Sequence, residues 1–355
     1  MIQHWLAKIL LSPFSLLYGM IITIRNSFYD AKLLKATRFN LPVIGVGNLS
    51  VGGAGKTPHV EYLISLLRPY IDVGVLSRGY KRKSKGFRFV NAQDKVFTAG
   101  DEPIQYKRKY RDVVVAVAES RVTAIPEIVK QYPHIQCILL DDSFQHRSVA
   151  PGINILLTEY DKLYSDDHLL PMGRLREWPS DAERAHCIII TKCPDELTDG
   201  DRQSVINRLS PEAHQKLFFS RYFYHKPYLL VDGRKRLEFN MDQSVILLSA
   251  IASSQYLEEY LDTKVGEYTS YKFEDHHYFT ERDLETISKA YKNLKSKQKY
   301  ILTTEKDAVR LFEHREFLVK EQLPVFILQI VVQFDANDGN RFDDYVKSYL
   351  LNVKV

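Results

Sequence analysis

The sequence contains little cysteine, no long uninterrupted apolar run and no repeated or low-complexity segment. Only three of its 355 residues are cysteine, and Cys137, Cys187 and Cys193 lack the spacing of a metal-binding or redox motif. We therefore expect reduced thiols, as in a cytosolic protein. A hydrophobic content of 45% with 26% charged residues is that of a folded globular protein, and the length favours about two domains.

The N-terminal segment is apolar but lacks the pattern of a membrane span. Residues 5–24 are mostly Leu, Ile, Phe, Met and Tyr, yet Lys8, Pro13 and several small or polar residues interrupt them. A spanning helix needs about 20 predominantly apolar residues. We do not expect a cleaved signal peptide either, because the positive charge follows the apolar part and no small-residue cleavage site is evident. The small and polar residues are spaced by three and four positions: Lys8, Ser12, Ser15, Gly19, Thr23 and Asn26.

This spacing predicts an amphipathic helix within residues 1–35. Steps of three and four place the polar residues on one side, which leaves a wide apolar face. We expect that face to lie in a membrane interface, with the basic residues that follow it near lipid headgroups. Those basic residues are Arg25, Lys32, Lys35 and Arg38. The alternative is a helix packed on the protein's own core or on a partner.

The net charge of +5 is small but unevenly distributed. Residues 78–111 hold eleven Lys and Arg against three Asp and Glu. Such a stretch is usually a solvated face, but it could also attract anionic substrates or an anionic membrane surface. A nucleic-acid partner is not expected, because the basic stretch lacks interleaved stacking aromatics in a recognised module.

The segment from residue 43 to residue 58 predicts a phosphate-binding loop. An apolar β-branched run leads into a Gly-rich turn, then into Lys56-Thr57 and a segment with helical periodicity. Glycines let backbone N–H groups converge on an anion, toward which the following helix points its positive end. The lysine supplies charge to the outer phosphates and the threonine hydroxyl is a Mg²⁺ ligand. Ser50 stands where the usual pattern has its first glycine. The residues expected to hold the nucleotide are Gly52, Gly53, Ala54, Gly55, Lys56 and Thr57.

A second chemical signal follows about 85 residues later, in the segment Cys137-Ile138-Leu139-Leu140-Asp141-Asp142. An apolar strand that ends in carboxylates is what a Mg²⁺-nucleotide site requires of its second strand. We expect Asp141 or Asp142 to bind the ion beside Thr57. Gln145 and His146 come directly afterwards, in the crevice where open α/β sheets bind ligands.

The remaining apolar runs predict the fold. Short continuous runs, separated by helical or polar stretches, are typical of parallel strands buried on both faces. They are residues 73–77, 113–118, 137–140, 153–158 and 187–191. Two strands around Lys226-Pro227 and new strand–helix units after residue 245 indicate a second part. We therefore predict an α/β fold with a P-loop NTPase-like parallel sheet over 36–222 and a smaller α/β domain over 223–355.

Several blocks of the sequence resemble the tetraacyldisaccharide 4′-kinase family, the lipid A 4′-kinases of Gram-negative bacteria. They run in family order from about residue 45 to residue 310 and are highly specific. The blocks are Gly47–Pro58, Leu76–Tyr80, Gly100–Pro103, Asp141–His146, Leu169–Glu177, Asp275–His277 and Thr304–Asp307. One departure is Ser143, where the family usually has glycine; it could alter the turn before Gln145.

The resemblance implies transfer of the ATP γ-phosphate to the 4′-hydroxyl of a tetraacyldisaccharide 1-phosphate. ATP and Mg²⁺ are then the implied cofactors, and the lipid and the membrane surface are the partners, with no obligate protein partner inferred. The implied location is the cytoplasmic face of the bacterial inner membrane. The resemblance also suggests Asp101 as the catalytic base, supported by His276, beside Lys56. A carboxylate next to an imidazole can orient it and share its proton.

Three arginines are further candidates for the nucleotide site. The guanidinium groups of Arg78, Arg174 and Arg176 match phosphate oxygens in a bidentate way, although each could instead be a surface ion-pair partner. The main alternative function is a membrane-associated P-loop GTPase or ATPase switch. Its guanine-binding motif has only a loose counterpart, Thr191-Lys192-Cys193-Pro194-Asp195.

Overall fold

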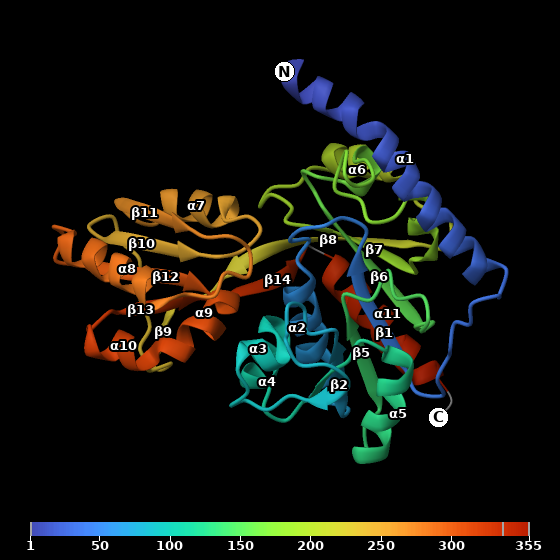
Figure 1. The fold of residues 1–355 in the computed structure, drawn as a ribbon, viewed down its shortest axis with the longest axis horizontal. Helices are drawn as coiled ribbons and strands as arrows, with labels where there is room; N and C mark the ends of the chain where they lie inside the picture. Colours follow the sequence, from blue (N-terminus) through green and yellow to red (C-terminus); the bar gives the residue numbers. More distant parts are fainter. Residues whose placement is uncertain (1, 336, 354–355) are drawn as a thin grey trace.

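The computed structural model describes residues 2–335 and 337–353, with the side chains of residues 2–7 and 9 outside what it describes. Figure 1 shows two sheets side by side, each with helices packed against it, and a long N-terminal helix along the larger unit. The predicted α/β class, with mainly parallel strands between helices, is confirmed.

The larger sheet has nine strands in the order β14-β8-β7-β6-β1-β5-β2-β4-β3. Its seven central strands are parallel, and only the edge strands β14 and β3 are antiparallel. The strands are β1 (Val43–Asn48), β2 (Val73–Ser77), β3 (Arg88–Phe89), β4 (Val114–Val117), β5 (Cys137–Asp141), β6 (Ile153–Glu159), β7 (Cys187–Thr191), β8 (Lys216–Tyr224) and β14 (Ile330–Phe334). The accompanying helices are α2 (Lys56–Leu67), α3 (Val96–Ala99), α4 (Asp101–Lys109), α5 (Arg121–Gln131), the 3₁₀ segment Pro179–Arg184, α6 (Asp199–Leu209) and α11 (Asp338–Asn352).

The smaller sheet has five strands in the order β11-β10-β12-β13-β9. Four are parallel, and β9 is an antiparallel edge strand. The strands are β9 (Tyr228–Leu229), β10 (Ser244–Ser249), β11 (Glu267–Lys272), β12 (Lys299–Thr304) and β13 (Val325–Leu328). The helices are α7 (Gln255–Asp262), α8 (Glu281–Asn293), α9 (Glu305–Leu311) and α10 (Arg315–Lys320).

Several central strands are buried along their whole length, which explains their continuous apolar sequence. All residues of β1, β2, β5 and β7 are buried, as are those of β10. A parallel strand covered by helices on both faces has no solvent side, so it gains nothing from alternating polar residues. Because the strands are parallel, their carboxyl ends and the loops that follow gather at one edge of each sheet.

The chain leaves the larger sheet after β8 and returns to it at β14, after β13 of the smaller sheet. The predicted division into residues 36–222 and 223–355 does not include this return. Strand β14 pairs antiparallel with β8 in the larger sheet. Helix α11 then places Phe342 and Val346 in the core of that sheet. Apolar side chains of β14 and α11 thus pack in a core whose other strands lie more than 100 residues earlier in the sequence. Local periodicity cannot predict such a long-range contact. The domain limits themselves remain a prediction.

The N-terminal helix α1 (Ile2–Asp30) lies along the larger unit. Ser15, Gly19 and Asn26 of its predicted polar seam are buried, whereas Lys8 is exposed. Ser15 Oγ donates to the Leu169 carbonyl, Thr23 Oγ1 accepts from Trp178 Nε1, and Asn26 Nδ2 donates to Asp181 Oδ1. The seam therefore packs on the protein through hydrogen bonds, and Gly19 lets the helix approach the apolar side chains of Leu169 and Trp178 closely.

The opposite face of α1 carries large apolar side chains that remain exposed. They are Leu10, Phe14, Leu16, Leu17, Met20, Ile21, Ile24 and Phe28. A contiguous apolar surface of this kind on a folded protein marks an interaction site. Within the described residues, no helix combines the length and apolar character required to traverse a bilayer.

Candidate active site

The loop after β1 has the backbone geometry of a phosphate-binding turn. Gly52 has a φ of 110° and Gly55 a φ of 86°, in the left-handed region that disfavours other residues. Gly55 is the N-cap of α2, so the first N–H groups of that helix face the end of the loop. Such a helix N-terminus attracts anions through its free N–H groups and its dipole.

Lys56 at the start of α2 is held between an amide and a carboxylate. Its Nζ donates to Asn48 Oδ1 at 2.8 Å and lies 3.5 Å from Asp142 Oδ1. The guanidinium of Arg176 reaches the same two groups, with Nη2 at 2.7 Å from Asn48 Oδ1 and 3.1 Å from Asp142 Oδ1. Asn48 thus arranges two cations beside the loop. Its position at the end of β1 signalled this in the sequence, but the prediction did not include it.

The carboxylates of Asp141 and Asp142, at the end of β5, lie in different electrostatic environments. Burial and the carboxylates of Glu102 and Asp142 raise the pKa of Asp141 to about 7. For Asp142, burial also opposes ionisation, but Lys56 and Arg176 outweigh it and lower the pKa well below the usual range. Ser77 Oγ donates to Asp141 Oδ2 at 3.1 Å. One carboxylate is therefore paired with cations and the other lies in a region of excess negative charge.

The turn after this pair accommodates Ser143 without strain. The left-handed residue is Asp142, with a φ of 47°, whereas Ser143 has no positive φ. The Ser143 N–H donates to the Val46 carbonyl at 3.1 Å. A glycine is therefore not required at this position.

A cavity of about 510 Å³ lies between the carboxyl-end loops of the two sheets. It brings together most of the predicted nucleotide and metal residues: Gly52, Gly53, Ala54, Gly55, Lys56, Thr57, Arg78, Asp141, Asp142 and Arg176. From the smaller unit it is lined by His276 and by residues that follow β10 and β12, among them Ala252, Tyr256 and Lys306. The cavity is therefore shared by both sheets.

His276 faces this cavity with a buried carboxylate behind it. Its Nδ1 lies 2.8 Å from Asp101 Oδ2, which also accepts from Arg310 Nη1 at 2.7 Å. The Asp101 and Arg310 side chains are each 2% exposed. On the other side of the ring, Nε2 lies 3.1 Å from the Lys306 ammonium. Because an ammonium group only donates, Nε2 accepts, and Nδ1 carries the proton that it donates to Asp101.

Lys306, within the block Thr304–Asp307 that was expected to close over the nucleotide from the second domain, lines the cavity. Its Nζ contacts Glu102 Oε1 at 3.1 Å and Asp275 Oδ1 at 3.3 Å, besides His276. Burial would lower its pKa, but the carboxylates of Glu102 and Asp275 raise it, so Lys306 is a cation. The block Thr304–Asp307 already included it, and the packing of α9 on α4 brings it to Glu102 of the larger unit.

Four predicted site residues do not line the cavity. Asp101 lies behind His276. The Arg174 side chain pairs with Asp167 at 2.8 Å, while its carbonyl accepts from Val51 N–H and so supports the loop. Gln145 Nε2 donates to the carbonyl of Asn48 at 2.9 Å, in a layer behind the loop.

His146, the fourth, is also removed from the cavity lining. Burial, together with the positive charges of Arg121 and Arg78, lowers its pKa to about 4, so this imidazole is neutral. Among the described residues, no cluster of three or more His, Cys, Asp or Glu side chains is arranged to hold a metal ion by itself.

Comparison with known proteins agrees with this geometry. The model of the tetraacyldisaccharide-1-P 4′-kinase family matches residues 7–350. The tetraacyldisaccharide 4′-kinase of Flavobacterium johnsoniae is 42% identical over 345 residues, which cover 97% of this chain and 98% of that protein. The one of Bacteroides thetaiotaomicron is 39% identical over 353 residues, with 96% and 92% covered.

A solved structure has the same fold over nearly the whole length. The "apo" form of LpxK from Aquifex aeolicus, crystallised in complex with ATP, aligns with a TM-score of 0.72 and 28% identity. The alignment covers 97% of this chain and 99% of that one. The sequence blocks, the two-sheet fold and these matches agree, and the chain belongs to the tetraacyldisaccharide-1-P 4′-kinase family.

Proposed function

We propose that this chain transfers the γ-phosphate of ATP to the 4′-hydroxyl of a tetraacyldisaccharide 1-phosphate, a step of lipid A biosynthesis. The main support is that the phosphate loop with Lys56 and His276 of the other unit line the same cavity. Membership of the kinase family supports the acceptor, and the Aquifex aeolicus relative crystallised with ATP supports the donor.

The loop from Gly52 to Thr57 is the proposed binding site for the nucleotide phosphates. Lys56 and the free N–H groups of α2 would neutralise the outer phosphates. Arg176 and Arg78 line the same cavity and would add bidentate contacts to phosphate oxygens. The support for this role is that phosphoryl transfer depends mainly on positioning and on charge neutralisation.

The oxygen donors at the end of β5 fit a magnesium ion. Asp141, Asp142 and Thr57 offer hard oxygen atoms on one side of the cavity, and Asp141 lies where negative charge is in excess. A bound Mg²⁺ would neutralise charge on the phosphates, and the phosphate oxygens would complete its ligand set.

Asp101 and His276 are the proposed base for the acceptor hydroxyl. His276 is the member that faces the cavity, and Asp101 holds its ring through Nδ1. A carboxylate in this position fixes the imidazole tautomer and stabilises the imidazolium that forms when the proton is taken up. Lys306, next to Nε2, lines the same cavity and would contact a phosphate oxygen when the substrates enter.

The exposed apolar face of α1 is the proposed membrane contact. Its side chains would enter the interface of the bacterial inner membrane on the cytoplasmic side, while the acyl chains of the substrate stay partly in the bilayer.

The alternative of a GTPase or ATPase switch gains no support from the site. Lys192 of the loose guanine motif pairs with Glu159 at 2.9 Å and lies over the ring of Tyr256.

The test is an incubation with ATP, Mg²⁺ and tetraacyldisaccharide 1-phosphate, with the phosphate count of the product read by mass spectrometry. We expect one added phosphate, and far less product when GTP replaces ATP. Lys56→Met should lower kcat by about 10²-fold or more, whereas Lys130→Met on the exposed surface of α5 should not. A wild-type enzyme that adds no phosphate would refute the proposed function.

A further inference from the structure

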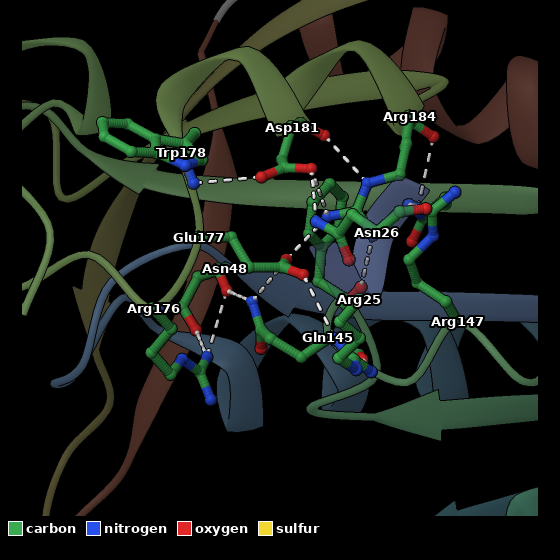
Figure 2. Close-up of polar contacts among 12 residues, drawn as sticks. Arg25, Asn26, Asn48, Gln145, Arg147, Arg176, Glu177, Trp178, Asp181 and Arg184 are labelled. Carbon is green, nitrogen blue, oxygen red and sulfur yellow. Dashed lines mark hydrogen bonds and ion pairs between the residues drawn. The ribbon is translucent and has the colours of Figure 1, made fainter. Parts of the chain in front are cut away.

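A layer of buried polar groups connects helix α1 with the phosphate loop (Figure 2). At its centre is Glu177, whose side chain is fully buried. Oε2 of Glu177 accepts from Arg184 Nη2 at 2.6 Å. Oε1 has no hydrogen bond and lies 3.7 Å from Nη1 of Arg25, which belongs to α1. A buried carboxylate requires compensating cations, and here one of the two comes from the N-terminal helix.

Gln145 carries the connection from Glu177 to the end of β1. Its Nε2 donates both to Glu177 Oε2 at 3.3 Å and to the carbonyl of Asn48 at 2.9 Å. Both partners only accept, so the amide has one possible orientation. The backbone carbonyl of Gln145 in turn accepts from Arg25 Nη2 at 2.7 Å. Arg25 therefore fixes this residue from two directions.

Asn48 connects this layer to the cationic groups of Lys56 and Arg176. Its Oδ1 accepts from Lys56 Nζ at 2.8 Å and from Arg176 Nη2 at 2.7 Å, while its Nδ2 donates to the Ser50 carbonyl at 2.7 Å. A second contact runs in parallel, because Tyr18 Oη of α1 donates to the carbonyl of Arg176 at 2.9 Å. Arg176 is thus one hydrogen bond away from α1, and Lys56 is three hydrogen bonds away, through Asn48.

We propose that Arg25, Glu177 and Gln145 are positioning residues through which the docked helix α1 holds Asn48, and thereby Lys56 and Arg176, in place for phosphoryl transfer. This inference rests on the proposed function of the site. It gives α1 a role separate from membrane contact: the apolar face contacts lipid, and the polar face completes the phosphate site. Small displacements of groups that bind a transferring phosphoryl group are costly to the rate, so the layer should influence kcat.

The experiment uses Arg25→Met in the full-length protein, assayed in detergent micelles that contain the acceptor, so that membrane targeting does not limit the rate. We expect kcat to fall about tenfold and ATP affinity to weaken several-fold, with the KM for the lipid nearly unchanged. The melting temperature should fall as well, because Glu177 loses one of its two cations, so the assay is run well below it. Arg25→Lys, which keeps the charge near Glu177, should recover part of the loss. The matched control, Arg282→Met on the exposed face of α8, should match the wild type.

A comparison of single and double variants tests whether Arg25 acts on Asn48 through Gln145. Gln145→Met should also lower kcat, and adding Arg25→Met to it should lower kcat little further, because residues of one connected network act together. Three results would overturn the inference: kcat and ATP affinity of Arg25→Met at the wild-type level, a change in the lipid KM alone, or fully multiplicative effects of the two substitutions. If the wild type phosphorylates no acceptor, the proposed function fails instead, and ATP affinity alone still decides whether Arg25 positions the loop.

Discussion

Nδ1 of His276 lies 2.8 Å from Oδ2 of Asp101, although 175 positions separate the two residues in the sequence. Asp101 begins α4 of the larger unit, and His276 follows β11 of the smaller one. The contact therefore joins the two units at the cavity, beside the ion pair of Asp101 with Arg310 of α9. The proposed base exists only while the two units are docked.

We predict that Asp101→Asn and His276→Gln each lower kcat by about 10²- to 10⁴-fold. His276→Gln removes the imidazole that takes the proton from the acceptor hydroxyl, and Asp101→Asn removes the carboxylate that orients this imidazole. Steady-state kinetics with the lipid acceptor would measure this. The neighbouring His277→Gln is a suitable control, since His277 pairs with Asp283 and stacks on Phe273 away from the cavity. A wild-type rate in His276→Gln would remove the pair from the mechanism.

Asp101→Ala should also destabilise the fold, which is the reason to prefer asparagine in that test. Arg310 is as buried as Asp101 and would lose its partner in the larger unit. Removing one member of a buried ion pair typically costs about 3–5 kcal/mol. Denaturant unfolding of Asp101→Ala should show this loss. Stability equal to that of the wild type would mean that Asp307 alone satisfies Arg310.

The stability of the protein should fall as the pH drops below about 6.5, in part because of His59. Burial lowers the pKa of His59 in α2 to about 4, despite a hydrogen bond to the Gly55 carbonyl. The unfolded chain then binds a proton before the folded chain does, so stability is present above the unfolded pKa and is lost as pH falls toward 4. Between about pH 7.5 and pH 5, this group alone should cost about 2 kcal/mol. Urea unfolding at both values should show a smaller difference for His59→Gln; an equal difference would contradict the prediction.

Binding to membranes should depend on the apolar face of α1 and not on its polar seam. Leu17→Glu and Ile21→Glu, both on exposed positions, should each weaken binding to vesicles of phosphatidylethanolamine and phosphatidylglycerol about tenfold or more. Vesicle flotation measures this, and Leu351→Glu on exposed α11 is the control. Deletion of residues 1–30 should also release the protein, but it removes Tyr18 and Arg25 as well. Undiminished flotation of the Glu variants would contradict the membrane role.

Two glycines of the loop segment should respond differently to alanine. A Cβ on Gly47 would lie 2.7 Å from the backbone nitrogen of Phe144, whereas the nearest atom to one on Gly53 is 3.9 Å away. Gly47→Ala should therefore destabilise the protein by about 1–3 kcal/mol, and Gly53→Ala should change its stability little. Thermal unfolding without nucleotide compares the two variants. The opposite order would show that the contact between β1 and the turn after β5 is not rigid.

The local parts of the site could be predicted from the sequence. Lys56 and Thr57 follow a strand and precede a helix, and Asp141 and Asp142 end a buried strand, so each lies at a predictable edge of a parallel sheet. The polar seam of α1 was likewise visible from spacing. Its inward orientation was not, because helical periodicity separates two faces without stating which one packs on the protein.

The remaining features depended on contacts between distant segments. Asn48 and Lys306 lie within the family-like blocks, but their contacts form only because α2, α9 and the segment around Arg176 pack around one cavity. The sequence by itself determined the strand–loop–helix chemistry and the amphipathic helix, since both depend on neighbours within a few residues. The tertiary structure alone decided that β14 and α11 return to the larger sheet, that His276 meets Asp101, and that α1 connects to the phosphate loop, because each requires two segments to come together across a long stretch of chain.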